Sequence, residues 1–241
     1  MTISSPPPSA GWYPAPDGSP GPWWWDGARW TQPHRQPVPI PPVATKAIAQ
    51  LAVATQVLLI ICGVVSVANI AVEGFGIASV TSYLDGNAAA MDMINTYDRS
   101  TVVVTILSSL GLLGAGVLWA CWQYRVAKLV PGRTRRSPGW HAWSWFIPVA
   151  CLWLPYQNIS DLWRAAGRAR PSWQIAWWLL WIASNVSIQV ASNIYTNSQA
   201  LEQFQVSMWM NIVGEGFLLA AAPLAWLTVR RITRGILQPT S

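Results

Sequence analysis

The sequence has few charged residues: Asp, Glu, Lys and Arg make up 10% of its 241 positions, against about 25% in an ordinary soluble domain. It also has only three cysteines, Cys62, Cys121 and Cys151, which stand in apolar runs without metal-ligand spacing. A disulfide framework and a zinc site are therefore not expected. The motifs of serine hydrolases, zinc proteases and phosphate- or dinucleotide-binding enzymes are missing as well. We predict a protein that is not an enzyme and that carries no cofactor or metal.

Hydrophobic residues dominate what is present. They account for 52% of the chain, with a mean hydropathy of +0.29 and 18 tryptophans. Four long apolar segments cover residues 47–71, 101–124, 173–196 and 209–229. Each has at least the ~20 residues that a helix needs to cross the hydrocarbon core of a bilayer, and a helix satisfies its backbone hydrogen bonds internally. The sequence thus predicts an all-α membrane protein with four transmembrane helices in residues 46–235.

Residues 140–168 form a further, shorter apolar stretch that is not expected to cross the membrane. Two prolines, Pro148 and Pro155, would interrupt a helix there. An amphipathic pattern follows them, and tryptophans favour the boundary between lipid headgroups and hydrocarbon. We expect a re-entrant or interfacial segment on the cytoplasmic leaflet, with interfacial residues at Trp145, Pro148, Trp153, Pro155, Trp163 and Arg164.

The distribution of Lys and Arg predicts the orientation of the protein. If residues 140–168 do not cross, every cation except Arg99 falls on one side of the membrane, because the connections 72–100 and 197–208 carry mainly acidic residues. Cytoplasmic loops are rich in Lys and Arg. We therefore expect a multi-pass protein of the cell membrane with both termini in the cytoplasm. The basic clusters are expected to face the lipid bilayer and not nucleic acid, because topology alone accounts for juxtamembrane cations.

The N-terminal region differs from the rest in composition, since residues 1–45 hold twelve of the 19 prolines. Residues 1–32 combine tryptophans with turn residues, and Asp26-Gly27 between aromatic runs is typical of a two-residue hairpin turn. Proline fixes φ and lacks a backbone donor, so residues 33–45 are predicted to form a semi-rigid linker. We predict a small hairpin-like cytoplasmic module in 1–32, a proline-rich linker in 33–45 and a short tail in 236–241.

Two stretches resemble known families. The run Gly-Trp-Tyr-Pro-Ala-Pro at 11–16, followed by Trp-Trp-Asp-Gly-Ala-Arg-Trp-Thr at 24–31, resembles the tryptophan-rich module called domain of unknown function 2510, which is common at the N-termini of actinobacterial membrane proteins. The run from Trp145 to Arg164 resembles the core motif of the membrane family called domain of unknown function 4328. The second resemblance implies a multi-pass bacterial membrane protein over most of 46–235. Neither resemblance implies an activity.

Polar side chains inside the third and fourth spans form a candidate intramembrane site. Asn185, Gln189 and Asn193 lie on one face of a helix, and Asn211 and Glu215 follow one turn apart in the next span. An ionisable group at this depth costs at least ~2–3 kcal/mol, so Glu215 is expected to face the bundle interior. Two interpretations stay open. One is a polar cavity or proton-linked path; the other is interhelical hydrogen bonding alone, worth ~0.6–2 kcal/mol for each contact.

The N-terminal module is a second candidate site, made of Trp12, Tyr13, Pro14, Trp25, Asp26, Gly27 and Trp30. Its aromatic side chains are expected either to form a groove for a proline-rich peptide or another cytoplasmic protein segment, or to fill the module's own small core. In the second span, Gly111 and Ala115 permit close helix packing, including packing between protomers of a homo-oligomer.

These observations favour a non-catalytic, envelope-associated interaction or scaffold protein that recruits a partner through its N-terminal module. The alternative is a small-molecule or ion transporter that uses the intramembrane polar surface of Asn185, Gln189, Asn193 and Glu215. A scaffold should depend on residues 1–45 and not on Glu215, whereas a transporter should show the reverse dependence.

Overall fold

The computed structural model describes residues 9–18, 22–31 and 42–238. The chain divides into two compact units, with the boundary between residues 40 and 41. Residues 33–41 of the predicted linker and residues 239–241 of the predicted tail lie outside the described residues. The remaining linker positions, 42–45, belong to the first long helix, and residues 236–237 belong to the last one.

The N-terminal unit is a three-stranded antiparallel sheet of β1 (Gly11–Pro14), β2 (Pro22–Trp25) and β3 (Trp30–Thr31), in that order. The predicted hairpin is present, but Trp25 pairs with Trp30, so its loop holds residues 26–29 and not two residues. The Asp26 side chain stabilises this longer loop. Its Oδ1 accepts backbone hydrogen bonds from Ala28 at 2.7 Å and from Arg29 at 2.6 Å.

The second unit is helical, and four long helices carry it: α1 (Pro42–Leu84), α2 (Ala90–Leu129), α5 (Trp173–Asn197) and α6 (Leu201–Leu237). In the part of the chain that the structure describes, these are the four helices long and apolar enough to cross a membrane. The predicted number of spanning helices is therefore confirmed, and each contains one of the predicted apolar segments.

Helix α1 runs far beyond its apolar segment. At 1.5 Å per residue its 43 residues extend about 65 Å, roughly twice the thickness of a hydrocarbon core. Helix extends into both ends of the predicted connection 72–100, so the residues between α1 and α2 are 85–89. Glu73 is thus not in a loop but on a buried face of α1. An acidic residue ends an apolar run in the sequence, yet the helix continues because its hydrogen bonds belong to the backbone.

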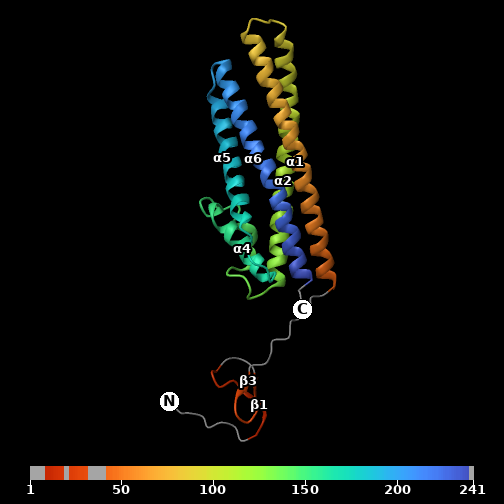
Figure 1. Ribbon diagram of the computed structural model, residues 1–241, viewed down its shortest axis with the longest axis vertical. Coiled ribbons are helices and arrows are strands. Elements are labelled where there is room, and N and C mark those ends of the chain that lie inside the picture. Colours follow the sequence, from red (N-terminus) through yellow and green to blue (C-terminus); the bar gives the residue numbers. More distant parts are fainter. Residues whose placement is uncertain (1–8, 19–21, 32–41, 239–241) are drawn as a thin grey trace. The chain divides into compact units, whose positions relative to one another are not determined.

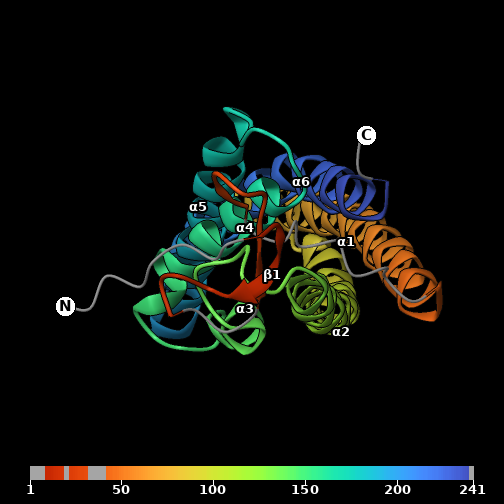
Figure 2. The same ribbon diagram turned by 90° about the horizontal axis from the view of Figure 1, so that it is seen from below.

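The four long helices pack in the order α2–α1–α6–α5 (Figures 1 and 2). Neighbouring helices in this order run antiparallel, and α1 and α6 form the central pair (Figure 1). Helices α2 and α5 make no comparable contact with each other. Helix α2 therefore lies beside α1 and helix α5 lies beside α6, and together they flank one face of the central pair.

The predicted interfacial segment folds against one end of the bundle as a cap, defined here as residues 138–168. It contains α3 (Pro138–Trp143), the 3-10 turn η1 (Ala150–Leu152) and α4 (Leu154–Ala165), none of them long enough to span a membrane. Helix α4 has Pro155 in its first turn, where the missing N–H is tolerated. It buries Ile159, Leu162 and Trp163 against the bundle.

Tryptophans form the core where the cap meets the long helices. Their ring centroids lie 5.0–6.2 Å apart in a cluster of Trp119, Trp122, Trp145, Trp177, Trp178 and Trp181. Three indole N–H groups of this cluster are satisfied internally. Trp122 donates to Thr233 Oγ1 at 2.9 Å, Trp145 donates to Gln123 Oε1 at 2.7 Å, and Trp178 donates to the Leu152 carbonyl at 3.2 Å. Indole hydrogen bonds thus tie the cap to α2, and α2 to α6.

Candidate functional site

Two helices that are far apart in the sequence carry the same short pattern. Helix α1 has Asn-Ile-Ala-Val-Glu-Gly-Phe at 69–75, and α6 has Asn-Ile-Val-Gly-Glu-Gly-Phe at 211–217. In each copy Asn and Glu are four residues apart, so they lie one turn apart on the same helix face. The polar residues predicted from the sequence include only the second copy. The repetition of the pattern is the signal that identifies the first.

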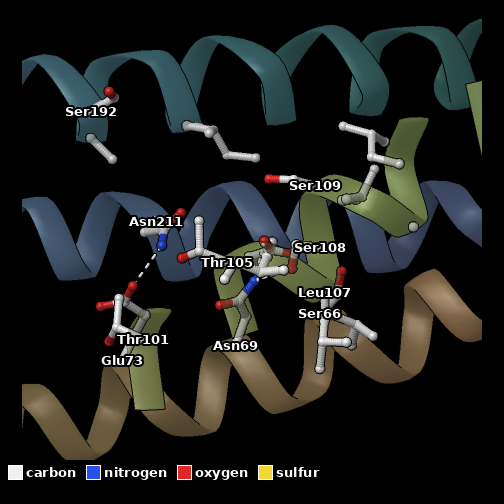
Figure 3. Close-up of a pocket in the computed structure, with 18 of the residues that line it drawn as sticks. Ser66, Asn69, Glu73, Thr101, Thr105, Leu107, Ser108, Ser109, Ser192 and Asn211 are labelled. Atoms are coloured by element: carbon white, nitrogen blue, oxygen red, sulfur yellow. Dashed lines mark hydrogen bonds between the residues drawn. The ribbon is translucent and has the colours of Figure 1, made fainter. Parts of the chain in front are cut away.

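The repeat produces a reciprocal pair of hydrogen bonds, because α1 and α6 are antiparallel (Figure 1). Asn69 Nδ2 donates to Glu215 Oε1 at 3.0 Å, and Asn211 Nδ2 donates to Glu73 Oε1 at 2.6 Å. Figure 3 shows the second of these bonds between α6 and α1. Each helix therefore supplies one carboxyl group and the amide that holds the carboxyl group of the other.

Helix α2 completes this arrangement from the side. The Tyr97 hydroxyl donates to Glu73 Oε2 at 3.0 Å, and Asn69 Nδ2 also donates to Ser108 Oγ at 2.8 Å. Gly76 makes room for the Tyr97 ring, because a Cβ there would lie 2.5 Å from ring carbon Cε2. The polar cluster is defined here as Asn69, Glu73, Tyr97, Asn211 and Glu215.

Both carboxyl groups of the polar cluster are buried, with Glu73 5% exposed and Glu215 6% exposed. Glu73 has a donor for each of its oxygens, whereas Glu215 Oε2 is buried without a hydrogen-bond partner. A buried polar atom without a partner costs about 1–3 kcal/mol. Glu215 Oε2 is therefore the atom of the cluster at which a proton or a ligand would be stabilising.

The polar cluster lines a cavity of about 590 Å³ between the four long helices (Figure 3). Hydroxyl side chains reach this cavity from every one of these helices: Ser66, Thr101, Thr105, Ser108, Ser109, Ser192 and Ser207. Small-molecule sites usually have volumes of about 300–1,000 Å³. The cavity, called the polar cavity from here on, therefore has the size and the hydrogen-bonding groups to hold one small organic ligand.

The polar cavity has two acidic groups without a basic partner. Among the described residues, the ion pairs join Asp161 of the cap to Arg135 and Arg164, and none involves Glu73 or Glu215. The same residues include no group of three or more His, Cys, Asp or Glu that could hold a metal ion. A buried carboxylate without a cationic partner costs several kcal/mol. The carboxyl groups are therefore expected to hold protons or the positive charge of a ligand.

A second, largely apolar cavity of about 280 Å³ adjoins the polar cavity on the side of the cap. Both cavities are lined by Cys62, Ser66, Leu112, Ile188 and Leu218. Four tryptophans, Trp119, Trp145, Trp177 and Trp181, form walls of the second cavity, which is called the tryptophan slot from here on. The lining thus changes from hydroxyl and carboxyl groups to aromatic and aliphatic ones along the bundle.

The predicted polar stripe of α5 does not join the polar cluster. Asn185, Gln189 and Asn193 are exposed. Asn185 lines the tryptophan slot, but its amide donates to the Trp181 carbonyl, and the amide of Asn193 donates to the Gln189 carbonyl, one turn back in the same helix. Of the five predicted polar residues, the structure brings Asn211 and Glu215 into the polar cluster.

Small residues decide which face of α5 turns inward. Helix α5 buries Ser184, Ser187 and Ala191, which allow the close helix approach that membrane bundles favour. The contact is tightest at Gly214 of α6, where a Cβ would lie 2.8 Å from Ile188 Cγ1. Gly111 behaves in the same way towards α1, because a Cβ there would meet Cys62 Sγ at 3.3 Å. The close packing predicted for Gly111 is therefore made within one chain.

The predicted interfacial residues divide between the protein interior and the surface. Pro155 and Trp163 are buried, and Trp145 is half-buried in the tryptophan cluster. Pro148, Trp153 and Arg164 are exposed, and Arg164 pairs with the buried Asp161. Part of the tryptophan content of 140–168 therefore serves the packing of the cap and not contact with lipid.

His141 is buried in the cap with neither ring nitrogen hydrogen-bonded. Burial lowers the pKa of His141 to about 4, which the nearby Asp161 carboxylate opposes and the Arg136 guanidinium reinforces. The imidazole is therefore neutral in the folded protein near neutral pH, and it behaves as a packing residue of the cap.

In the N-terminal module, three of the predicted residues form an interior cluster. Trp25 and Trp30 have ring centroids 5.0 Å apart, and Tyr13 packs edge-on against Trp30 at 6.2 Å. Trp25 is buried. The backbone N–H groups of the loop lower the pKa of Asp26, and Gly27 adopts the positive φ of 101° that favours glycine. These residues therefore stabilise the fold of the module.

The exposed aromatic surface of the module lies on the other side of the sheet. Trp12 and Trp24 are directly paired across β1 and β2, with ring centroids 5.5 Å apart, and are 57% and 37% exposed. Pro14 and Pro22 form the next pair on the same face. Trp12 and Pro14 were predicted as partner-binding residues, and the structure adds Trp24 and Pro22 beside them.

Comparison with known proteins identifies the helical unit. The family described as Domain of unknown function (DUF4328) matches residues 85–234, from the α1–α2 connection into α6, and the match does not include α1. No curated protein and no solved structure matches the chain. The match covers more than half of the chain and confirms the family predicted from the run between Trp145 and Arg164. The chain therefore belongs to the family described as Domain of unknown function (DUF4328).

Proposed function

We propose that the protein is a non-enzymatic membrane carrier of small organic cations, in which Glu73 and Glu215 exchange protons for the positive charge of the solute. The observation that carries this proposal is the polar cavity of about 590 Å³, which contains two buried carboxyl groups with no basic partner among the described residues. A purely structural role is less well supported. Interhelical hydrogen bonds of ~0.6–2 kcal/mol would hold the bundle together without a cavity beside them.

Proton exchange follows from the energetics of charge at membrane depth. In the absence of solute, protons neutralise the carboxyl groups, because an unpaired carboxylate in a medium of low polarity costs several kcal/mol. A cationic solute compensates the negative charge instead, and its binding releases protons. Glu215 Oε2, which has no hydrogen-bond donor, is the acceptor offered to the solute. Solute affinity should therefore fall as the pH is lowered, since protons compete for the same groups.

The test is the binding of tetramethylammonium, a small permanent cation, to the purified full-length protein in lipid nanodiscs. Calorimetry in buffers of different ionisation enthalpy should detect proton release. Glu215→Gln should weaken binding at least about tenfold, which corresponds to about 1.4 kcal/mol. Glu202→Gln is the matched control, because Glu202 lies exposed in the first turn of the same helix. Unchanged affinity in both Glu215→Gln and Glu73→Gln would contradict the proposal.

A second function, recruitment of a partner by the N-terminal module, is favoured by the exposed pair of Trp12 and Trp24. Aromatic surfaces of this kind bind proline-rich segments in the polyproline conformation. The resemblance to domain of unknown function 2510 supports a self-contained module. A fluorescently labelled proline-rich peptide should bind the full-length protein and lose affinity when Trp12 and Trp24 are both replaced by Ala. Arg29→Ala in the exposed loop is the control.

We also propose that the cap and both termini face the cytoplasm, with the cap at the membrane interface. The support is the concentration of Lys and Arg in the segments that precede α1, surround the cap and end α6. In a variant without native cysteines, a membrane-impermeant thiol reagent applied to intact cells should label Asn87→Cys in the α1–α2 connection and should not label Ser137→Cys beside the cap. Labelling of Ser137→Cys alone would show that the protein has the opposite orientation.

A further inference from the structure

We infer that the ligand of the polar cavity is an amphiphile, which places a positively charged head at Glu215 and an apolar tail in the tryptophan slot and which enters from the bilayer between α2 and α5. This inference rests on the proposed function and adds the chemical class of the ligand to it. It depends on three observations: a cavity with carboxyl and hydroxyl groups that adjoins an aromatic one, the lack of close packing between α2 and α5 away from the Trp119–Trp177 contact, and open space beside Gly116.

The two cavities adjoin, because five residues line both of them. Along this continuous lining, hydroxyl and carboxyl groups give way to Trp119, Trp177 and Trp181. A ligand that is polar throughout would lose its hydration in the tryptophan slot, where Ser66, Ser184 and Asn185 are the polar residues of a mainly apolar lining. A ligand that is apolar throughout would leave Glu215 Oε2 buried and unpaired. An amphiphile satisfies both ends.

The side from which a ligand enters follows from the helix order. Helices α2 and α5 both line the two cavities and touch through the rings of Trp119 and Trp177, but their backbones do not pack closely as those of the neighbouring helices do (Figure 2). Val102 and Ile106 of α2 line the polar cavity and are also more than half exposed. The mouth of the cavity is thus edged by side chains suited to hydrocarbon. At the other end, Trp145 and Phe146 of the cap close the tryptophan slot.

The tryptophan slot contains space that the protein does not fill. A Cβ added at Gly116 would meet no atom within 4 Å, although Gly116 lines the slot. Small residues, Ala115, Ala221 and Ala225, keep neighbouring walls open. Its volume of about 280 Å³ equals that of roughly nine water molecules in the liquid. This is room for one short alkyl or aromatic tail and not for the two chains of a bilayer lipid.

The experiment compares two probes with the same head, tetramethylammonium and decyltrimethylammonium, on the full-length protein in nanodiscs. Gly116→Phe adds a bulky side chain at the wall of the tryptophan slot, and its Cβ would meet no atom within 4 Å. The matched control is Val117→Phe, because Val117 is the next residue of α2 and is 57% exposed. Gly116→Phe should weaken the decyl probe at least about tenfold, the loss expected when as few as two methylene groups are displaced from an apolar site. It should leave tetramethylammonium binding unchanged, and Val117→Phe should affect neither probe.

The outcomes separate this inference from the proposed function. Partition of the decyl probe into lipid is the same for every variant. The ratio of the apparent dissociation constants of two variants therefore reports only the binding of the probe to the protein. If Gly116→Phe weakens neither probe, or weakens both equally, the assignment of the tail to the slot is overturned, even where Glu215→Gln weakens both. If Glu215→Gln and Glu73→Gln change the binding of neither probe, the proposed function itself fails, whatever Gly116→Phe does.

Discussion

Gly76 allows the polar cluster to be perturbed without the replacement of any polar group. A Cβ at this position would lie 2.5 Å from Cε2 and 2.6 Å from Cδ2 of Tyr97, about 1 Å closer than carbon atoms normally approach. The ring must therefore move by a comparable distance in Gly76→Ala. The hydrogen bond of 3.0 Å from the Tyr97 hydroxyl to Glu73 Oε2 cannot survive that displacement.

The expected loss of stability follows from two opposing effects. Loss of this hydrogen bond leaves Glu73 Oε2 buried without a donor, which costs about 1–3 kcal/mol, and alanine favours a helix over glycine by about 1 kcal/mol. Gly76→Ala should therefore destabilise the protein by up to about 2 kcal/mol. Gly74→Ala in the same helix has only the second effect, since its Cβ would meet no atom within 4 Å. It should stabilise the protein by up to about 1 kcal/mol.

The assay is reversible unfolding of the purified full-length protein in mixed detergent micelles, followed by circular dichroism. Tyr97→Phe should also destabilise the protein, and its combination with Gly76→Ala should cost less than the sum of the two, because both remove the same hydrogen bond. Equal stability of Gly76→Ala and Gly74→Ala would refute the placement of the Tyr97 ring against Gly76. Full additivity with Tyr97→Phe would refute the link from that ring to Glu73.

Three further predictions concern the cap and the module. The pKa of His141 is lowered from 6.5 to about 4 in the folded protein, so between these pH values the unfolded chain binds a proton that the folded protein does not. Stability should therefore fall as the pH is lowered from neutrality, by about 2 kcal/mol at pH 5. The thermal midpoint of His141→Gln should depend less on pH than that of the wild-type protein. Leu162→Ala, at a fully buried position of α4, should cost about 2–5 kcal/mol, and Leu152→Ala, at an exposed position of the cap, less than about 0.5 kcal/mol; similar losses in chemical unfolding would contradict the packing of α4. Asp26→Ala should disorder the hairpin loop, seen as a loss of the near-ultraviolet signal of the Trp25–Trp30 pair, whereas Asp26→Asn, which keeps an acceptor for Ala28 and Arg29, should retain it. The same signal should weaken in wild type only at pH values below the usual Asp range, since the pKa of Asp26 is lowered.

Hydropathy predicted the four apolar segments because each spanning helix needs a long apolar run, but it does not show how far a helix continues beyond such a run. The segment 72–84 of α1 contains Glu73 and several small residues, so it resembles a loop by composition. In the structure it is helix, and Glu73 is accommodated on it because Tyr97 and Asn211 of the neighbouring helices donate hydrogen bonds to its carboxyl group. Such partners come from distant parts of the chain, and local composition does not contain them.

The candidate site was predictable in part. An acidic residue at membrane depth marks a buried polar site on energetic grounds alone, and Glu215 was identified in this way. The inward face of α5 was not identified, because α5 has both a polar stripe and a stripe of small residues that could face the bundle. In the structure Ser184, Ser187 and Ala191 are the ones that are buried. Asn185 and Asn193 can remain outside since their amides bond to carbonyl groups of their own helix.

The exposed surface of the module depends on strand register. Alternation in β2 shows that Trp24 points away from its neighbours Trp23 and Trp25, but it does not tell which face is covered. The third strand decides this, because the four-residue loop brings Trp30 opposite Trp25. A hairpin whose loop consisted of Asp26-Gly27 alone would bring Ala28 there instead and would leave Trp25 uncovered.

The reciprocal bonds between α1 and α6 restrict how the bundle can move. A slide of α1 along α6 breaks both bonds at once. One helical turn away, about 5.4 Å, it would set Glu73 against Glu215 in one direction and Asn69 against Asn211 in the other. Neither register restores an amide–carboxyl pair, so translation of the two helices past each other is blocked in both directions. Motions that widen or narrow the cavity are therefore expected to pivot about this pair, with α2 and α5 as the parts that swing.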